Sequence, residues 1–217
     1  MEIEIHEFLD ASGRSPFSHW FEDLNAVAAA RVTVALARLS QGNFSNVEGV
    51  GAGVYELKIY FGPGYRVYFG RDGERIVILL GGSAKKKAIC GDYDRASGVG
   101  RVQIPQERQG KQQMALTREF RETVYDRAQH DSKFRKALLT EAVNAYLNGD
   151  EGTGKAVLRD VVNATIGFER LAADLKKPSK SLHRMLGPSG NPSTANFFAI
   201  LQVLQKRVGI RLTVKAA

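Results

Sequence analysis

The stretch YELKIYFGPGYRVYF, residues 55–69, decides the fold of the first part of the chain. Apolar and polar residues alternate on both sides of Gly62-Pro63-Gly64, which is the pattern of two half-buried strands joined by a turn. Asp72-Gly73 is a second hairpin signal and leads into an aliphatic third strand over residues 74–80. We therefore expect three antiparallel strands in this region.

The segments before these strands predict the rest of a small α+β domain. Residues 2–8 alternate as an edge or half-buried strand does, and residues 16–40 carry an apolar stripe at helical spacing. A helix over residues 16–40 would end at Gly42. The helical part would pack on the apolar face of the sheet.

The expected register gives the sheet a polar face. A three-residue loop at residues 62–64 would place Tyr60 opposite Arg66 and Lys58 opposite Tyr68, with Glu56 on the same face. The buried face would carry Leu57, Ile59, Phe61, Val67, Phe69, Ile76, Ile78 and Leu80. The polar face is either a solvated surface with ordinary cross-strand pairs or a surface that contacts phosphates and bases.

Composition limits the class of protein. The chain has 217 residues, of which 43% are hydrophobic and 25% charged, so it is not collagenous, disordered or membrane-spanning. Met1-Glu-Ile-Glu-Ile is no signal peptide, and the only cysteine is Cys90, so we expect a cytoplasmic protein without an internal disulfide. The four histidines are scattered, and we expect no metal and no cofactor.

The excess positive charge lies at one end of the chain. Residues 1–90 carry ten basic and ten acidic side chains, whereas residues 170–217 carry nine basic side chains and Asp174 as the only acidic one. A compact basic region indicates a polyanionic partner. The alternative is a solvated face of lysine and arginine.

A change in composition divides the chain. Residues 91–113 are rich in glycine, glutamine and charge and poor in aliphatic residues, so we expect a flexible linker there. Met114 and the small residue after it resemble the start of a second protein. We therefore predict two proteins joined end to end: residues 1–90, here called the N-terminal half, and residues 114–217, the C-terminal half.

The C-terminal half is predicted to be helical, with helices over residues 117–129, 132–148, 151–165, 167–175, 179–186 and 193–204 and a strand over 209–214. The two short helices, with Leu171, Leu175, Leu182 and Leu186 as their core, predict a helix-turn-helix. A plain helical bundle with a basic surface is the alternative. The side chains placed for DNA are Ser179, Lys180, Ser181, His183 and Arg184 in the major groove and Asn191, Ser193 and Thr194 at phosphates.

Residues 149–156, GDEGTGKA, nearly match the sequence motif of a phosphate-binding loop. Ala156 stands where a serine or threonine would hold magnesium, and the preceding segment is predicted to be helical rather than a strand. We therefore interpret these residues as a connection between helices.

Residues 1–89 resemble the RelE/HigB-type toxins, in particular the phage-derived HigB branch. The resemblance rests on residues 55–59, 62–69 and 79–87 together. It implies a RelE-like domain, two helices on a small antiparallel sheet, that cleaves mRNA on the ribosome without a metal. The implied catalytic residues are Lys58, Arg66, Lys86, Glu56 and Tyr68, and the implied RNA-binding residues are Tyr60, Lys85 and Lys87.

The chemistry of such cleavage fits these residue types. The 2′-hydroxyl of the RNA attacks its own phosphate, so the enzyme must accept a proton, neutralise the phosphorane charge and protonate the leaving oxygen. Lys58 and Arg66 would stabilise charge. Glu56 or Lys58 would accept the proton, and neighbouring cations with desolvation would lower the pKa of Lys58 for that task.

The sequence departs from the toxin pattern after Lys87. Such toxins end in an amphipathic helix, whereas helical spacing is lost from Ala88 onward. A reading-frame change in the last toxin codons would explain the loss. The N-terminal half is therefore either an active endoribonuclease or a toxin domain inactivated by truncation.

The C-terminal half resembles the HigA-type antitoxins, and Gly167-Phe-Glu-Arg-Leu-Ala resembles the first helix of their DNA-binding motif. The resemblance implies that this half neutralises the toxin and represses its operon as a homodimer on operator DNA. Toxin before antitoxin is also the HigB/HigA gene order. The expected partners are thus mRNA on the ribosome and operator DNA. The two halves are also expected to contact each other, within one chain or between chains. No membrane partner is expected. A third interpretation is a fusion whose linker has no biological role.

Overall fold

The computed structural model describes residues 3–72, 76–84 and 117–213 and shows a mixed α+β fold with eight helices in these ranges. The linker expected at residues 91–113 lies outside them. The chain forms two compact units. The sheet unit comprises residues 1–24 and 42–120, and the helical unit comprises residues 25–41 and 121–217.

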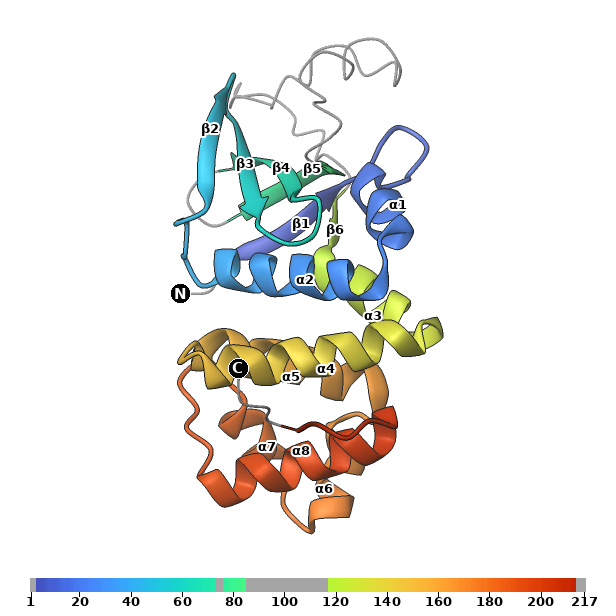
Figure 1. Ribbon diagram of the computed structural model, residues 1–217, viewed down its shortest axis with the longest axis vertical. Helices are drawn as coiled ribbons and strands as arrows, with labels where there is room; N and C mark the ends of the chain where they lie inside the picture. Colours follow the sequence, from blue (N-terminus) through green and yellow to red (C-terminus); the bar gives the residue numbers. More distant parts are fainter. Residues whose placement is uncertain (1–2, 73–75, 85–116, 214–217) are drawn as a thin grey trace, which may run out of the picture. The chain divides into compact units, whose positions relative to one another are not determined.

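The sheet unit contains six strands in the order β2-β3-β4-β5-β1-β6 (Figure 1). Neighbouring strands are antiparallel except β1 and β5, which are parallel. The bounds are β1 Glu4–Phe8, β2 Val47–Gly51, β3 Val54–Ile59, β4 Tyr65–Asp72, β5 Ile76–Ala84 and β6 Thr117–Glu119. Strand β6 replaces the start of the helix expected from residue 117.

The register between β3 and β4 differs from the expected one by two residues. Lys58 lies opposite Arg66, and Glu56 lies opposite Tyr68. The connection therefore spans Tyr60 to Gly64 instead of three residues, and Gly62 and Gly64 both have positive φ. Because the difference is an even number of residues, each side chain keeps its expected face.

The expected register of the third strand is wrong. Leu79 pairs with Phe69, and Ile78 pairs with Gly70. We expected Ile76, Ile78 and Leu80 opposite the buried face of β4, whereas the residue opposite Phe69 of that face is Leu79. The difference is already present at the end of the strand pair, where Asp72 pairs with Ile76, and a further register shift lies between Tyr68 and Phe69.

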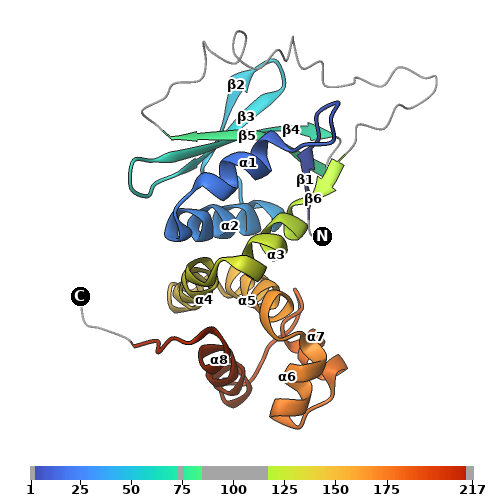
Figure 2. The ribbon, with the colours of Figure 1, turned by 90° about the vertical axis from the view of Figure 1, so that its right-hand side faces the viewer.

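Helix α1, Pro16–Asp23, packs against β5 and β1 through aromatic side chains. Phe17 and Phe21 are fully buried, and the ring of Trp20 meets Tyr65 edge-on. Figure 2 shows α1 lying over the sheet. The apolar face of β3 and β4 is buried as expected, with Leu57, Val67 and Phe69 among its least exposed residues. This apolar face leaves the opposite face of the hairpin for polar side chains.

The single helix expected over residues 16–40 is two helices. The first helix ends before Leu24, which has an extended backbone, and Asn25 caps α2, Ala26–Ser40, by accepting a hydrogen bond from the backbone N–H of Ala28. An asparagine side chain in this position satisfies a free N–H of the first turn and so starts a new helix. Helix α2 belongs to the helical unit.

The other helices of the helical unit are close to expectation. Their bounds are α3 Phe120–His130, α4 Ser132–Leu147, α5 Glu151–Thr165, α6 Phe168–Leu175, α7 Ser179–Met185 and α8 Thr194–Val208. Asp131, Asp150 and Ser193 cap α4, α5 and α8. The expected terminal strand is wrong in its described part, because residues 210–213 form no strand.

Helices α6 and α7 pack together through a short connection, and Leu171, Leu182 and Leu186 are fully buried, while Leu175 is half-buried. Lys176 ends α6 in the left-handed conformation. Among the helices of the described ranges, none is long and apolar enough to cross a bilayer.

Candidate functional site

The polar face of the β2-β3-β4 hairpins gathers five side chains, which we call the polar cluster: Glu48, Glu56, Lys58, Arg66 and Tyr68. Pairing of β2 with β3 puts Glu48 opposite Glu56, and pairing of β3 with β4 puts Lys58 opposite Arg66. Opposed residues of antiparallel strands share a face. The strands therefore bring together four expected site residues and one, Glu48, that was not expected.

Each cation of the polar cluster is paired with a carboxylate. Nη1 of Arg66 lies 3.0 Å from Oε2 of Glu56, and Nζ of Lys58 lies 3.4 Å from Oε1 of the same residue. Nζ of Lys58 also donates to Glu48. Glu56 is buried, which a carboxylate tolerates when cations contact both of its oxygens. The four charges cancel.

The pairing changes the titration of these groups. The hydrogen bond to Glu48 raises the pKa of Lys58, and the charge of Glu56 raises the pKa of Arg66. The hydrogen bond from Lys58 lowers the pKa of Glu48. The expected lowering of the Lys58 pKa is therefore wrong, because neighbouring carboxylates outweigh desolvation. Lys58 is therefore a cation at neutral pH.

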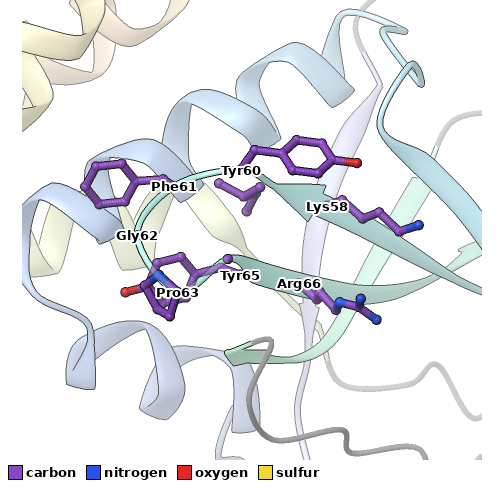
Figure 3. Close-up of a pocket in the computed structure, with 9 residues that line it drawn as sticks. Lys58, Tyr60, Phe61, Gly62, Pro63, Tyr65 and Arg66 are labelled. Carbon is purple, nitrogen blue, oxygen red and sulfur yellow. The ribbon is translucent and has the colours of Figure 1, made fainter.

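A hollow of about 410 Å³ lies beside the cluster at the β3–β4 connection. It is lined by residues 58–66, which include both cations. Tyr60 is 80% exposed at its margin. Figure 3 shows the side chains of Lys58, Tyr60 and Arg66 directed to the same side of the hairpin. An exposed aromatic ring beside two cations can stack on a base and hold its phosphate.

Several expected site residues cannot be placed, and one was missed. Lys85, Lys86 and Lys87 lie outside the described residues. Glu48 was missed because Val47-Glu-Gly-Val-Gly51 contains two glycines and gives a weak strand signal. Val47 and Val50, both strand-favouring residues, were the signal available.

A second set of candidate site residues lies on α7 and at the start of α8. Lys180 and Arg184 are exposed one helical turn apart on α7, and Asn191 and Thr194 are exposed near the start of α8. Positive side chains beside a helix N-terminus suit phosphate contacts. Ser181 is half-buried on α7.

Three other residues expected at DNA have partners within the protein. Ser179 donates to Oε1 of Glu169 over 2.7 Å and so ties α7 to α6. The exposed ring of His183 stacks on Phe168 with centroids 3.7 Å apart. The hydroxyl of Ser193 accepts from the backbone N–H of Asn196 as the cap of α8. The first two contacts tie α7 to α6, and the third caps α8.

No group of three or more histidine, cysteine, aspartate or glutamate side chains that could hold a metal occurs within the ranges the structure covers. No protein-family model matches the chain. No solved structure matches it either. An uncharacterized protein of Haemophilus influenzae is 40% identical over 70 residues, which are 32% of this chain and 71% of that protein. Over those 70 residues, the chain belongs to the same family as the Haemophilus influenzae protein.

Proposed function

We propose that the chain is a fused type II toxin–antitoxin protein. The N-terminal half is a metal-independent mRNA endonuclease that acts on the ribosome, and the C-terminal half is a DNA-binding antitoxin that neutralises it and represses the operon. The observation that carries the endonuclease is the meeting of Lys58, Arg66 and Glu56 on one sheet face, beside the exposed ring of Tyr60.

Each side chain has a task in this proposal. Arg66 and Lys58 neutralise the negative charge that develops as the 2′-hydroxyl attacks its phosphate. Glu56 accepts the proton of that hydroxyl. The bond from phosphorus to the 5′ oxygen then breaks, and the 5′ oxygen takes up a proton from water, which leaves a cyclic phosphate and a free 5′-hydroxyl. Tyr60 stacks on a base at the margin of the hollow. The charge of Glu56 and, to a smaller extent, a hydrogen bond with Tyr68 of the same strand raise the pKa of Arg66 and keep it charged.

The second candidate is a transcriptional repressor that carries an inactive toxin domain. The ion pairs favour it, because Glu48 and Glu56 already satisfy both cations and a substrate phosphate would have to displace at least one carboxylate. The departure from the toxin pattern after Lys87 favours it too.

The antitoxin part of the proposal rests on α6 and α7 as a helix-turn-helix. The buried leucines give the pair a common core, and Lys180 and Arg184 are exposed on the second helix. The net positive charge of residues 170–217 supplies attraction to DNA.

The size of the Haemophilus influenzae relative supports a fusion. The same 70 residues are 71% of that protein but 32% of this chain, so the relative is less than half as long. A separate protein of this size fits one half of the chain.

A reconstituted translation reaction tests the endonuclease. The full chain and residues 1–90 are added separately, circular dichroism checks that the fragment is folded, and mRNA cleavage is mapped by primer extension. Inhibition by the fragment that Arg66→Ala removes supports the endonuclease. Absence of cleavage by a folded fragment supports the repressor.

Binding to the DNA upstream of the gene tests the second activity. Lys180→Ala combined with Arg184→Ala should weaken binding by roughly 30-fold or more, since each contact to a base or phosphate contributes about 1–3 kcal/mol. Lys136→Ala, an exposed lysine on α4, is the control with one positive charge removed. Equal effects of both variants would reject α7 as the recognition helix.

A further inference from the structure

The N-terminal half contributes helix α2 to the helical unit. Helix α2 contacts α4 and α5 of the C-terminal half, and Figure 1 shows α2 and α4 side by side. Most of the apolar side chains of α2, among them Val32, Leu36 and Leu39, are buried. The helix is therefore a structural part of the C-terminal helices and not a surface attachment.

Polar contacts fix α2 in one position on these helices. Nε of Arg31 lies 3.0 Å from Oε2 of Glu141 on α4, and Nε of Arg38 lies 2.7 Å from Oδ2 of Asp150 at the start of α5. Arg31 and Arg38 are seven residues apart, which is two helical turns, so both point to the same side of α2. Gln41 adds a hydrogen bond to Thr153, with 3.3 Å between Nε2 and Oγ1.

The surface on α4 and α5 is incomplete without α2. The side chain of Glu141 is only 8% exposed, and burying a carboxylate without a cation is costly. Arg31 supplies that cation. Asp150 both caps α5 and accepts from Arg38, so the second ion pair ties α2 to the point where α5 begins.

The C-terminal half contributes β6 and Phe120 to the sheet unit in return. Residues 117–119 add to the edge of β1, with Thr117 opposite Phe8 and Glu119 opposite His6. The ring of Phe120 meets both Phe17 and Phe21 edge-on at 5.7 Å. Strand addition covers a free sheet edge and is a common way for proteins to bind extended segments.

We infer that the two halves recognise each other within one chain through this exchange of α2 for β6, and that they stay associated when the connection over residues 91–113 is cut. The face formed by α4 and α5 is then the docking surface for the second helix of a toxin-type half. Naming the halves toxin and antitoxin rests on the proposed function, but the association itself does not.

A protease site placed within residues 91–113 of the full chain tests the inference. The purified chain is cut to completion under native conditions and analysed by size-exclusion chromatography with light scattering. We expect the cut sample to keep the particle mass of the uncut chain, whose single copy has a mass of 23.8 kDa, with both fragments present. Fragments that separate at micromolar concentration would overturn the inference.

A pair of charge reversals identifies the surface. Arg31→Glu with Arg38→Glu should weaken the association of the cut fragments by about tenfold or more, because each new carboxylate faces Glu141 or Asp150. Lys136→Glu, exposed on α4, is the control for charge and should leave the association unchanged. If the reversed chain does not fold before cutting, Arg31→Gln with Arg38→Gln replaces it. An association that neither arginine pair weakens would reject the docking surface.

The mass of the particle tests the exchange of α2 for β6, and mRNA cleavage and DNA binding test the proposed function. Fragments that stay together but neither cleave mRNA nor bind DNA would keep the exchange and reject the proposed function. Fragments that separate and then cleave mRNA and bind DNA would keep the proposed function and reject the exchange.

Discussion

Glu56 on β3 and Arg66 on β4 form an ion pair of 3.0 Å on the polar face of the sheet, and Glu56 is the buried member of the pair. The same carboxylate also contacts Lys58. Glu56 therefore holds both cations in place and at the same time cancels part of their charge. Its replacement separates these two effects.

Glu56→Gln should lower stability and raise affinity for RNA. The variant loses charge-assisted hydrogen bonds to Arg66 and Lys58, which costs about 1–3 kcal/mol in the free energy of unfolding. The polar cluster then has a net charge of about +1, which attracts phosphate. Urea unfolding and fluorescence polarisation with a short RNA measure the two effects.

Glu48→Gln is the matched control, because it also removes one of the two carboxylates that contact Lys58, but an exposed one. It should raise RNA affinity with a smaller loss of stability, since exposed ion pairs contribute little. Equal losses of stability in both variants would contradict the structural role of Glu56.

Asp150→Asn should reduce the loss of stability in acid. Burial alone would raise the pKa of Asp150, but hydrogen bonds from Arg38 and Thr153 outweigh burial and lower it from 3.8. A carboxyl group whose pKa is lowered by folding stabilises the folded state above the pKa of the unfolded state. This contribution is lost as the pH falls through the pKa of the folded state. The asparagine variant should be less stable than the parent near neutral pH and equal to it near about pH 2.

Chemical denaturation between about pH 2 and 7 measures this difference. Asparagine also caps helices, so the comparison isolates the charge. Asp174→Asn, which removes an exposed pair with Arg207, is the control and should change stability less at neutral pH. A pH-independent difference for Asp150→Asn would contradict the prediction.

Lys155→Met should destabilise the connection between α7 and α8. The buried Nζ of Lys155 donates to the carbonyl of Pro188 over 3.3 Å and to that of Gly190 over 2.5 Å. Losing both bonds leaves two carbonyls without this donor and costs about 1–3 kcal/mol. Thermal unfolding measures the loss, and faster amide hydrogen exchange over residues 187–192 should locate it. Lys206→Met, which replaces an exposed lysine on α8, should change neither the thermal unfolding nor the hydrogen exchange of residues 187–192.

Gly82→Ala should destabilise the sheet unit. A Cβ atom at Gly82 would overlap the ring of Trp20, and overpacking of this kind costs about 1–3 kcal/mol. Trp20 is the only tryptophan, so its fluorescence reports the displacement directly. Gly49→Ala is the control, because no atom lies within 4 Å of the added Cβ. A stable variant with unchanged emission would contradict the close packing of Trp20 on β5.

Local signals predicted the helices of the C-terminal half well. Asp131 and Ser193 are side chains that start helices, and both helices begin at the expected residues. The break at Leu24 was missed because neither glycine nor proline marks it, and an asparagine within an otherwise helical pattern is ambiguous.

Non-local features could not be predicted from spacing. The pairing of β1 with β6 joins segments more than a hundred residues apart, and nothing in the sequence of residues 117–119 distinguishes a strand from a helix start. The faces of Lys58 and Arg66 followed from alternation, but their partners did not, because Glu48 comes from a strand with a weak signal. Alternation fixes a face, whereas pairing depends on turn length and bulges.

The exchange of α2 for β6 also sets an order of events during synthesis. The ribosome releases β1 and α2 long before it has made the segments that they pair with, α4, α5 and β6. A nascent N-terminal half therefore has an uncovered sheet edge until translation has passed residue 119, and an unpaired helix until it has passed residue 165. Each completed N-terminal half is therefore made in the same chain as the segments that cover its sheet edge and its helix.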